Sequence, residues 1–81
     1  MTLFTKNDCG KCDFVKQHVN LDHLGVRVEV LGPENCEALA HLAWHGLVTE
    51  AEKNLPILVL DDMTHLSGAI PIKTYLTELE N

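Results

Sequence analysis

The stretch that decides the fold is TKNDCGKCDFVKQ, residues 5–17, in which two cysteines lie three residues apart. It follows TLFT, a short run typical of a β-strand. Beyond it, Cys12, Val15 and Val19 recur at i, i+3 and i+7, which predicts a helix over residues 12–22. The two cysteines are therefore expected where the end of a strand meets the start of a helix.

The position of Cys9 before that helix favours its thiolate form. The first turn of a helix offers unpaired backbone N–H groups and the positive end of the helix dipole, and both stabilise a negative sulfur. Lys6 and Lys11 add positive charge, whereas Asp8 and Asp13 oppose it. The sequence thus predicts Cys9 as an exposed attacking thiolate with moderate support from its surroundings.

Cys12 lies one helical turn later and is expected to be more buried. At this spacing the two cysteines can close a disulfide, and Gly10 gives the backbone the freedom to do so. A second thiol held near an attacking thiolate is what thiol–disulfide exchange requires to resolve a mixed disulfide. Such a short loop constrains the unfolded chain only weakly, so a structural disulfide is the less favoured interpretation.

The middle of the chain predicts a strand, a helix and a connection. VRVEV, residues 26–30, alternates as a strand whose valine side is the more buried one, and Gly25 is expected to end the preceding helix. A second helix is predicted within residues 31–47, and residues 48–54 are read as a polar connection. His41 and His45 are interpreted as a solvated face. The expected core face comprises Cys36 (a buried structural thiol), Leu39, Ala40 and Ala43.

The last third predicts a hairpin and a helix. ILVL, residues 57–60, reads as a strand covered on both faces, and Asp61-Asp62 turns the chain into a second strand that ends at Ser67-Gly68. The final helix is expected to bury Ile72, Tyr75, Leu76 and Leu79.

The element order predicted is β-α-β-α-β-β-α, an α/β fold. The first two strands, joined by a helix, are expected to be parallel with a right-handed crossover, and the last two antiparallel. A four-stranded mixed sheet with helices on both faces follows, with residues 57–60 central and the last strand at an edge.

Composition sets the broad class. The 81 residues, 46% of them apolar, predict one domain over residues 1–81. A net charge of −6 argues against nucleic acid and anionic membranes as partners. Neither a long apolar run nor a secretory signal is expected, so a cytoplasmic location is predicted. There, cysteine pairs are mainly catalytic or metal-binding, and three cysteines fit a disulfide framework poorly.

Two interpretations of the CxxC pair remain open on these grounds. A redox couple is favoured because the pair lies between a strand and a helix of a β-α-β unit. A metal site would need further ligands, for which Cys36, His41 and His45 are available. The sequence contains no second CxxC, and no metal is expected.

Three segments together resemble a known family. FTKNDCGKC (residues 4–12), NLPILVL (54–60) and HLSG (65–68) are similar to the thioredoxin fold in its short glutaredoxin-like form, most closely to the NrdH redoxins. The resemblance covers essentially the whole chain. It implies a monomeric dithiol–disulfide oxidoreductase, an electron carrier of cell redox homeostasis without a bound cofactor. Its electrons would come from NADPH through a thioredoxin reductase and pass to protein disulfides such as those of ribonucleotide reductase.

The resemblance also implies roles for individual residues. Cys9 would be the nucleophile and Cys12 the resolving thiol of a redox-active Cys9–Cys12 disulfide. An extended substrate segment would bind at a cis-proline by short β-augmentation. The supporting residues would be Lys6, Gly10 and Lys11 for the thiolate, and Leu55, Pro56 (cis), Ser67 and Gly68 for the substrate.

Departures from the family concern the substrate. After Ser67-Gly68 these redoxins continue with an aromatic residue, a basic residue, Pro and Asp, whereas this chain has Ala69-Ile70-Pro71-Ile72. Glutathione is the alternative reductant, and Lys6 with Leu55-Pro56 matches part of its site in glutaredoxins. The acidic group that would hold its ammonium is missing from residues 68–71, which favours a protein disulfide as the substrate.

Overall fold

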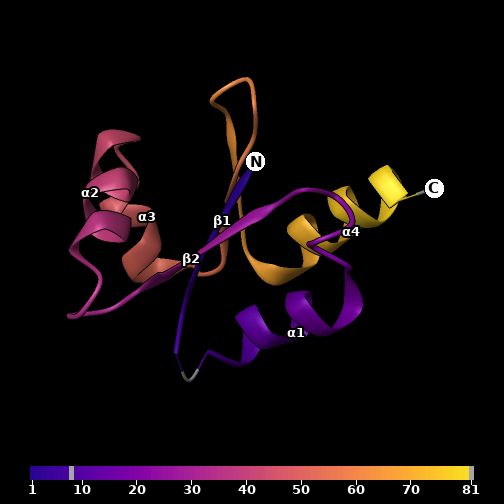
Figure 1. Cartoon of the computed structure of the whole chain (residues 1–81), viewed down its shortest axis with the longest axis horizontal. Coiled ribbons are helices and arrows are strands. Elements are labelled where there is room, and N and C mark those ends of the chain that lie inside the picture. The colour runs from indigo at the N-terminus through magenta and orange to yellow at the C-terminus, as the bar shows by residue number, and fades with distance from the viewer. Residues whose placement is uncertain (8, 81) are drawn as a thin grey trace.

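The computed structural model describes residues 1–7 and 9–80, and Figure 1 labels most of its elements. In chain order these are β1 (Thr2–Lys6), α1 (Gly10–His18), β2 (Arg27–Leu31), α2 (Cys36–Trp44), α3 (Val48–Lys53), β3 (Ile57–Val59), β4 (His65–Ser67) and α4 (Ala69–Glu80). The described residues thus form an α/β structure with four strands and four helices. No helix among them is both long and apolar enough to cross a bilayer.

The four strands form one mixed sheet in the order β2-β1-β3-β4. β1 runs parallel to β2 and antiparallel to β3, and β3 and β4 form an antiparallel hairpin. These pairings confirm the predicted parallel start, the hairpin, the interior position of the ILVL strand and the edge position of the last strand. The hairpin turn is longer than expected, with Met63 at a φ of 72° and β4 beginning only at His65.

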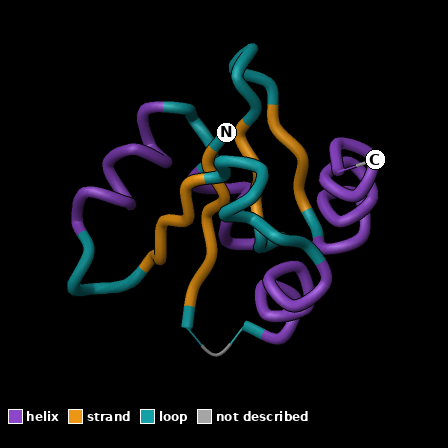
Figure 2. The backbone as a smooth tube through the Cα atoms, turned by 45° about the vertical axis from the view of Figure 1, so that its right-hand side comes forward, coloured by secondary structure: helices purple, strands orange, loops and turns teal. Residues whose placement is uncertain are grey.

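Two hydrophobic clusters pack on opposite faces of the sheet, because neighbouring residues of a strand point to opposite sides. Leu3 and Leu58 belong to the cluster beneath α1 and α4, with Val15, Ile72 and Leu76. Phe4, Ile57 and Val59 belong to the other cluster, with Leu42 of α2 and Leu47 before α3. Figure 1 and Figure 2 show the helix pairs on either side of the strands, which confirms the predicted two-sided cover.

The first helix ends at His18, four residues earlier than predicted. Val19 is extended, with φ −132° and ψ 135°, and both Val19 and Leu21 are buried. Two side chains two residues apart can face one core from an extended chain but not from a helix, which explains the early end. Gly25, at φ 69°, therefore serves the turn before β2, where its N–H donates to the carbonyl of Asp22.

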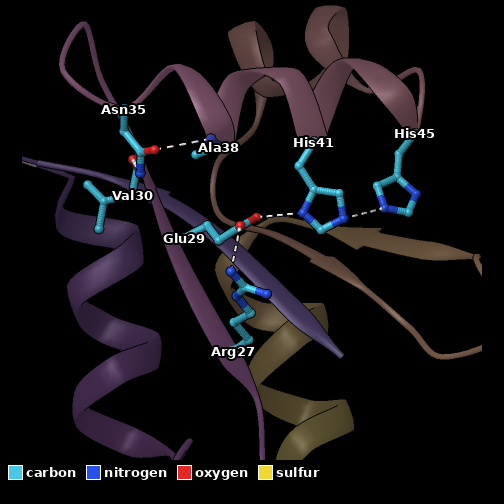
Figure 3. Close-up of polar contacts among 7 residues, drawn as sticks. All are labelled: Arg27, Glu29, Val30, Asn35, Ala38, His41 and His45. Carbon is cyan, nitrogen blue, oxygen red and sulfur yellow. Dashed lines mark hydrogen bonds and ion pairs between the residues drawn. The ribbon is translucent and has the colours of Figure 1, made fainter.

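The predicted core face of α2 is wrong. Cys36, Leu39, Ala40 and Ala43 are exposed, and Ala38 and Leu42 are buried instead. Asn35 determines which face of α2 meets the sheet. Its side-chain amide donates to the carbonyl of Val30 (2.9 Å), and its Oδ1 accepts from the N–H of Ala38 (3.1 Å). Because this cap ties the helix start to β2 (Figure 3), the residues in register with Ala38 face the sheet.

Three smaller expectations also need correction. Residues 48–53 form the short helix α3 instead of a connection, because Leu47 and Ala51, four residues apart, pack into the second cluster. Leu79 is exposed near the end of α4. The burial of β2 agrees with the prediction only in part. Val26, just before the strand, is buried and Arg27 is exposed, but Val28 is exposed and the Glu29 side chain is mostly covered.

The rotation of α2 can be tested with two substitutions on that helix. Leu42 is 1% exposed and Leu39 is 51% exposed. Leu42→Ala is expected to lower the free energy of unfolding by about 2–5 kcal/mol, since it leaves a cavity in the core. Leu39→Ala serves as the matched control and should change it by at most about 0.5 kcal/mol. Urea denaturation measures both, and a larger loss for Leu39→Ala would mean that the helix face is assigned wrongly.

Candidate functional site

Cys9 and Cys12 lie at the junction of β1 and α1, where the sequence places them. Cys9 is the N-cap of α1, with extended backbone angles of φ −109° and ψ 105°. Its Sγ accepts a hydrogen bond from the N–H of Cys12 at 3.2 Å, and its carbonyl accepts one from the N–H of Asp13. The sulfur thus takes the position that a hydroxyl or carboxylate oxygen has in most helix caps. Both residues are free thiols.

The two thiols differ in their surroundings. Cys12 is fully buried, and this burial, together with its hydrogen bond to Cys9, raises the pKa of the Cys12 thiol to about 11. The backbone of Lys6 and the charge of Lys16 act in the opposite direction but do not offset it. Cys12 therefore keeps its proton at neutral pH. Cys9 is only 8% exposed, so the expectation of an exposed sulfur is wrong, although it is the more open of the two.

A small cavity opens beside Cys9, and we call it the basic hollow. Its volume is about 180 Å³, and it is lined by Lys6, Cys9, Lys11, Ala51, Glu52, Lys53 and Leu55. The structure thus places Lys6, Lys11 and Leu55 around one cavity with Cys9. Lys53 was not predicted, because it enters the site only through the position of α3.

A second cavity borders the first turn of α1, and we call it the apolar hollow. It has a volume of about 470 Å³ and is lined by Gly10, Lys11, Phe14, Gly68, Ala69, Ile70 and Pro71. Ile70 is largely exposed within it. Gly68, at φ 93°, takes a backbone conformation that side chains disfavour, and this turn starts α4 next to Gly10.

The Leu55–Pro56 peptide bond is cis, in agreement with the expectation for Pro56. Pro56 itself is buried, and its carbonyl accepts a hydrogen bond from the N–H of Gly68 at 3.0 Å. Ile57, the next residue, pairs with Ser67 in the hairpin. The Leu55-Pro56 segment is thereby attached to Ser67-Gly68, so these four predicted residues form one structural unit.

The side chain of Ser67 has a hydrogen-bond partner, Glu50, that the sequence does not predict. Its Oγ donates to Glu50 Oε1 at 2.8 Å, and the amide of Asn54 donates to the same oxygen at 3.4 Å. These two hydrogen bonds lower the pKa of the Glu50 carboxyl, the one from Ser67 most. The hydrogen bond between Glu50 and Ser67 thus connects α3 to β4. No local pattern could reveal it, since the two residues are 17 apart.

His41 and His45 are not the solvated face that the sequence predicts. Figure 3 shows both rings pointing from α2 toward β2, where His41 Nδ1 lies 2.7 Å from Glu29 Oε2. His45 Nε2 lies 3.1 Å from His41 Nε2, and Arg27 approaches Glu29 from the other side at 3.7 Å. Burial, and secondarily the charge of His41, lowers the pKa of His45.

The remaining candidate ligands do not assemble around the cysteine pair. Cys36 is exposed at the start of α2, so its interpretation as a buried structural thiol is wrong. In residues 1–7 and 9–80 no three His, Cys, Asp or Glu side chains are arranged to hold a metal ion. Within the described part of the chain, Cys9 and Cys12 therefore have no further ligand to complete a tetrahedral site.

Fold and site together define a small α/β protein in which one thiol caps a helix over a second, buried thiol, close to a cis-proline. No family model, no curated protein and no solved structure matches this chain. Its function must therefore be inferred from the geometry of the site itself.

The lowered pKa of His45 predicts how stability depends on pH. Above its ordinary pKa of 6.5, His45 is neutral in both the folded and unfolded states. As pH falls below 6.5, the unfolded state binds the proton first, so stability should decrease until the folded pKa is passed. His45→Gln should flatten this acid slope in urea denaturation, with His23→Gln at an exposed turn as the control. An unchanged slope in His45→Gln would contradict the assignment.

Proposed function

We propose that this protein is a dithiol–disulfide oxidoreductase of the glutaredoxin-like thioredoxin fold, and that it reduces disulfides of protein substrates through Cys9 and Cys12. One observation carries the proposal: the Cys9 sulfur caps α1 directly over the buried Cys12 thiol. The sheet order β2-β1-β3-β4 supports it, with the cysteine pair following β1 and the cis-proline preceding β3.

In the first step, the thiolate of Cys9 attacks a substrate disulfide. A bond forms between Cys9 Sγ and one substrate sulfur, the substrate S–S bond breaks, and the other substrate sulfur leaves as a thiolate that takes up a proton. Before the attack, the negative charge on Cys9 Sγ is stabilised by the N–H of Cys12 and by the helix dipole. The helix start thus prepares the nucleophile.

In the second step, Cys12 resolves the mixed disulfide. Its thiol gives its proton to solvent and the thiolate attacks Cys9 Sγ. The Cys9–Cys12 bond forms, the bond between Cys9 Sγ and the substrate sulfur breaks, and that sulfur leaves as a thiolate that takes up a proton. Two electrons have then passed from the cysteine pair to the substrate. Burial is the main cause of the raised pKa of Cys12, and the hydrogen bond to Cys9 and the charge of Cys9 add to it. The contribution of that charge is absent from the mixed disulfide, in which Cys9 is neutral.

The substrate segment is proposed to lie along Leu55-Pro56. Leu55 lines the basic hollow together with Cys9, so an extended segment bound there places its disulfide beside the sulfur. The carbonyl of Pro56 accepts a hydrogen bond from the N–H of Gly68, and this bond holds Leu55-Pro56 in place. The apolar hollow next to Gly10 then offers a position for an apolar side chain of the substrate.

The source and destination of the electrons are also part of the proposal. The resemblance of residues 4–12 to the NrdH redoxins supports an NADPH-dependent thioredoxin reductase as donor and ribonucleotide reductase as a target. In this scheme the protein is a monomeric cytoplasmic electron carrier that binds no cofactor.

A second candidate function is that of a glutathione-dependent glutaredoxin. The basic hollow favours it, because Lys6, Lys11 and Lys53 present positive charge to a ligand with carboxylates. Residues 68–71, Gly-Ala-Ile-Pro, weigh against it, since they carry no acidic side chain for the ammonium group of glutathione. We therefore rank it second.

Single cysteine substitutions test the mechanism in insulin reduction. Cys9→Ser should lower activity to background, because no nucleophile remains. Cys12→Ser should accumulate a mixed disulfide with the substrate, visible as added mass on a non-reducing gel. Cys36→Ser, at an exposed position outside the site, is the control and should retain full activity.

The same assay, run with NADPH and two donors, separates the two candidate functions. Rapid NADPH oxidation with thioredoxin reductase supports the first, whereas turnover only with glutathione and glutathione reductase supports the second. If Cys9→Ser keeps its activity with either donor, or if Cys9→Ser and Cys12→Ser behave alike, the assigned roles are wrong.

A further inference from the structure

Positive charge is concentrated around the thiol of an otherwise acidic protein. The chain has 6 Lys and Arg residues against 12 Asp and Glu. Three of those basic residues, Lys6, Lys11 and Lys53, line the basic hollow. Among its described lining residues, Glu52 is the only carboxylate. Lys6, Lys11 and Lys53, with Glu52, thus give the lining of the basic hollow a net charge of +2, opposite in sign to the net charge of −6, while Asp13 in the first turn of α1 opposes it.

The three lysines come from three elements, so only the fold brings them together. Lys6 ends β1, Lys11 lies in the first turn of α1, and Lys53 ends α3. α3 is positioned by the packing of Ala51 and by the hydrogen bond from Ser67 to Glu50. In residues 1–7 and 9–80 none of these lysines forms a salt bridge, and all three are exposed. Among the described residues, no salt bridge therefore neutralises these three charges, although that of Lys53 also acts on Glu50.

We propose that this site selects substrates whose disulfide-bearing segment carries acidic side chains next to the cysteine; the inference rests on the proposed function. An acidic segment is repelled by most of the protein surface and attracted to the basic hollow, so encounters are directed to the sulfur. A basic segment is repelled by the lysines of the basic hollow and attracted to the acidic remainder of the surface, away from Cys9. Complementary charge of this kind acts mainly on the association rate and on partner choice.

Two synthetic substrates test the proposal with the full-length protein. Each is a disulfide-linked dimer of one short peptide, and the two peptides differ only in having Glu or Lys on both sides of the cysteine. At low ionic strength we expect kcat/KM for the Glu peptide to exceed that for the Lys peptide about 10-fold. In ~1 M salt, where the screening length is about 3 Å, the ratio should approach one.

A matched pair of variants locates the effect. Lys53→Gln should lower the Glu-to-Lys ratio about 3-fold, because one of the charges facing the substrate is lost. Arg27→Gln changes the net charge of the protein by the same amount. Because Arg27 lies at the opposite end of the β1–β2 pair from Lys6, the Glu-to-Lys ratio of this variant should equal that of the wild-type protein. Both kcat/KM values of a ratio are measured with the same variant, so a change in the reactivity of Cys9 affects both equally and cancels.

The outcomes separate this inference from the proposed function. Equal rates for the two peptides, a faster Lys peptide, or equal effects of Lys53→Gln and Arg27→Gln would overturn charge selection while leaving disulfide reduction intact. If the wild-type protein reduces neither peptide, the proposed function itself is wrong and the inference falls with it.

Discussion

The site depends on one contact, the hydrogen bond from the backbone N–H of Cys12 to the sulfur of Cys9. This bond makes Cys9 the cap of α1, and it places the sulfur where the backbone dipoles of the first turn converge. It also holds Cys12 behind Cys9, in an apolar environment that keeps its proton in place. A single local geometry thus gives two identical side chains different surroundings.

The sheet supplies the surroundings of that contact. Because β1 lies between β2 and β3, its end meets the start of β3, where the cis peptide bond of Leu55-Pro56 lies. Residues far apart in sequence, such as Lys6 and Lys53, are then neighbours of Cys9. On the other face, α2 is connected to the edge strand β2 by the contacts of Glu29 with His41 and of His41 with His45. These residues do not line the cavity beside Cys9.

The sequence predicts those features that short-range patterns determine. The strand–CxxC–helix unit, the interior strand β3 and the hairpin follow from periodicity and turn residues, and the structure confirms them. The sequence does not identify the buried face of α2, because two stripes of that helix have helical spacing. The inner stripe contains His41, whose partner Glu29 lies on another element. α3 is too short to form on its own and depends on tertiary packing, so Glu50 and Lys53 could not be placed.

In the proposed function, Cys9 and Cys12 form a reversible two-electron couple. The most direct test equilibrates the protein in buffers of graded ratios of reduced to oxidised dithiothreitol, blocks free thiols by alkylation and measures the mass of the products. A reversible couple should show one transition between forms that differ by two alkyl groups, with Cys36 alkylated throughout. A protein with no such transition, or one in which Cys36 replaces either partner, would contradict it.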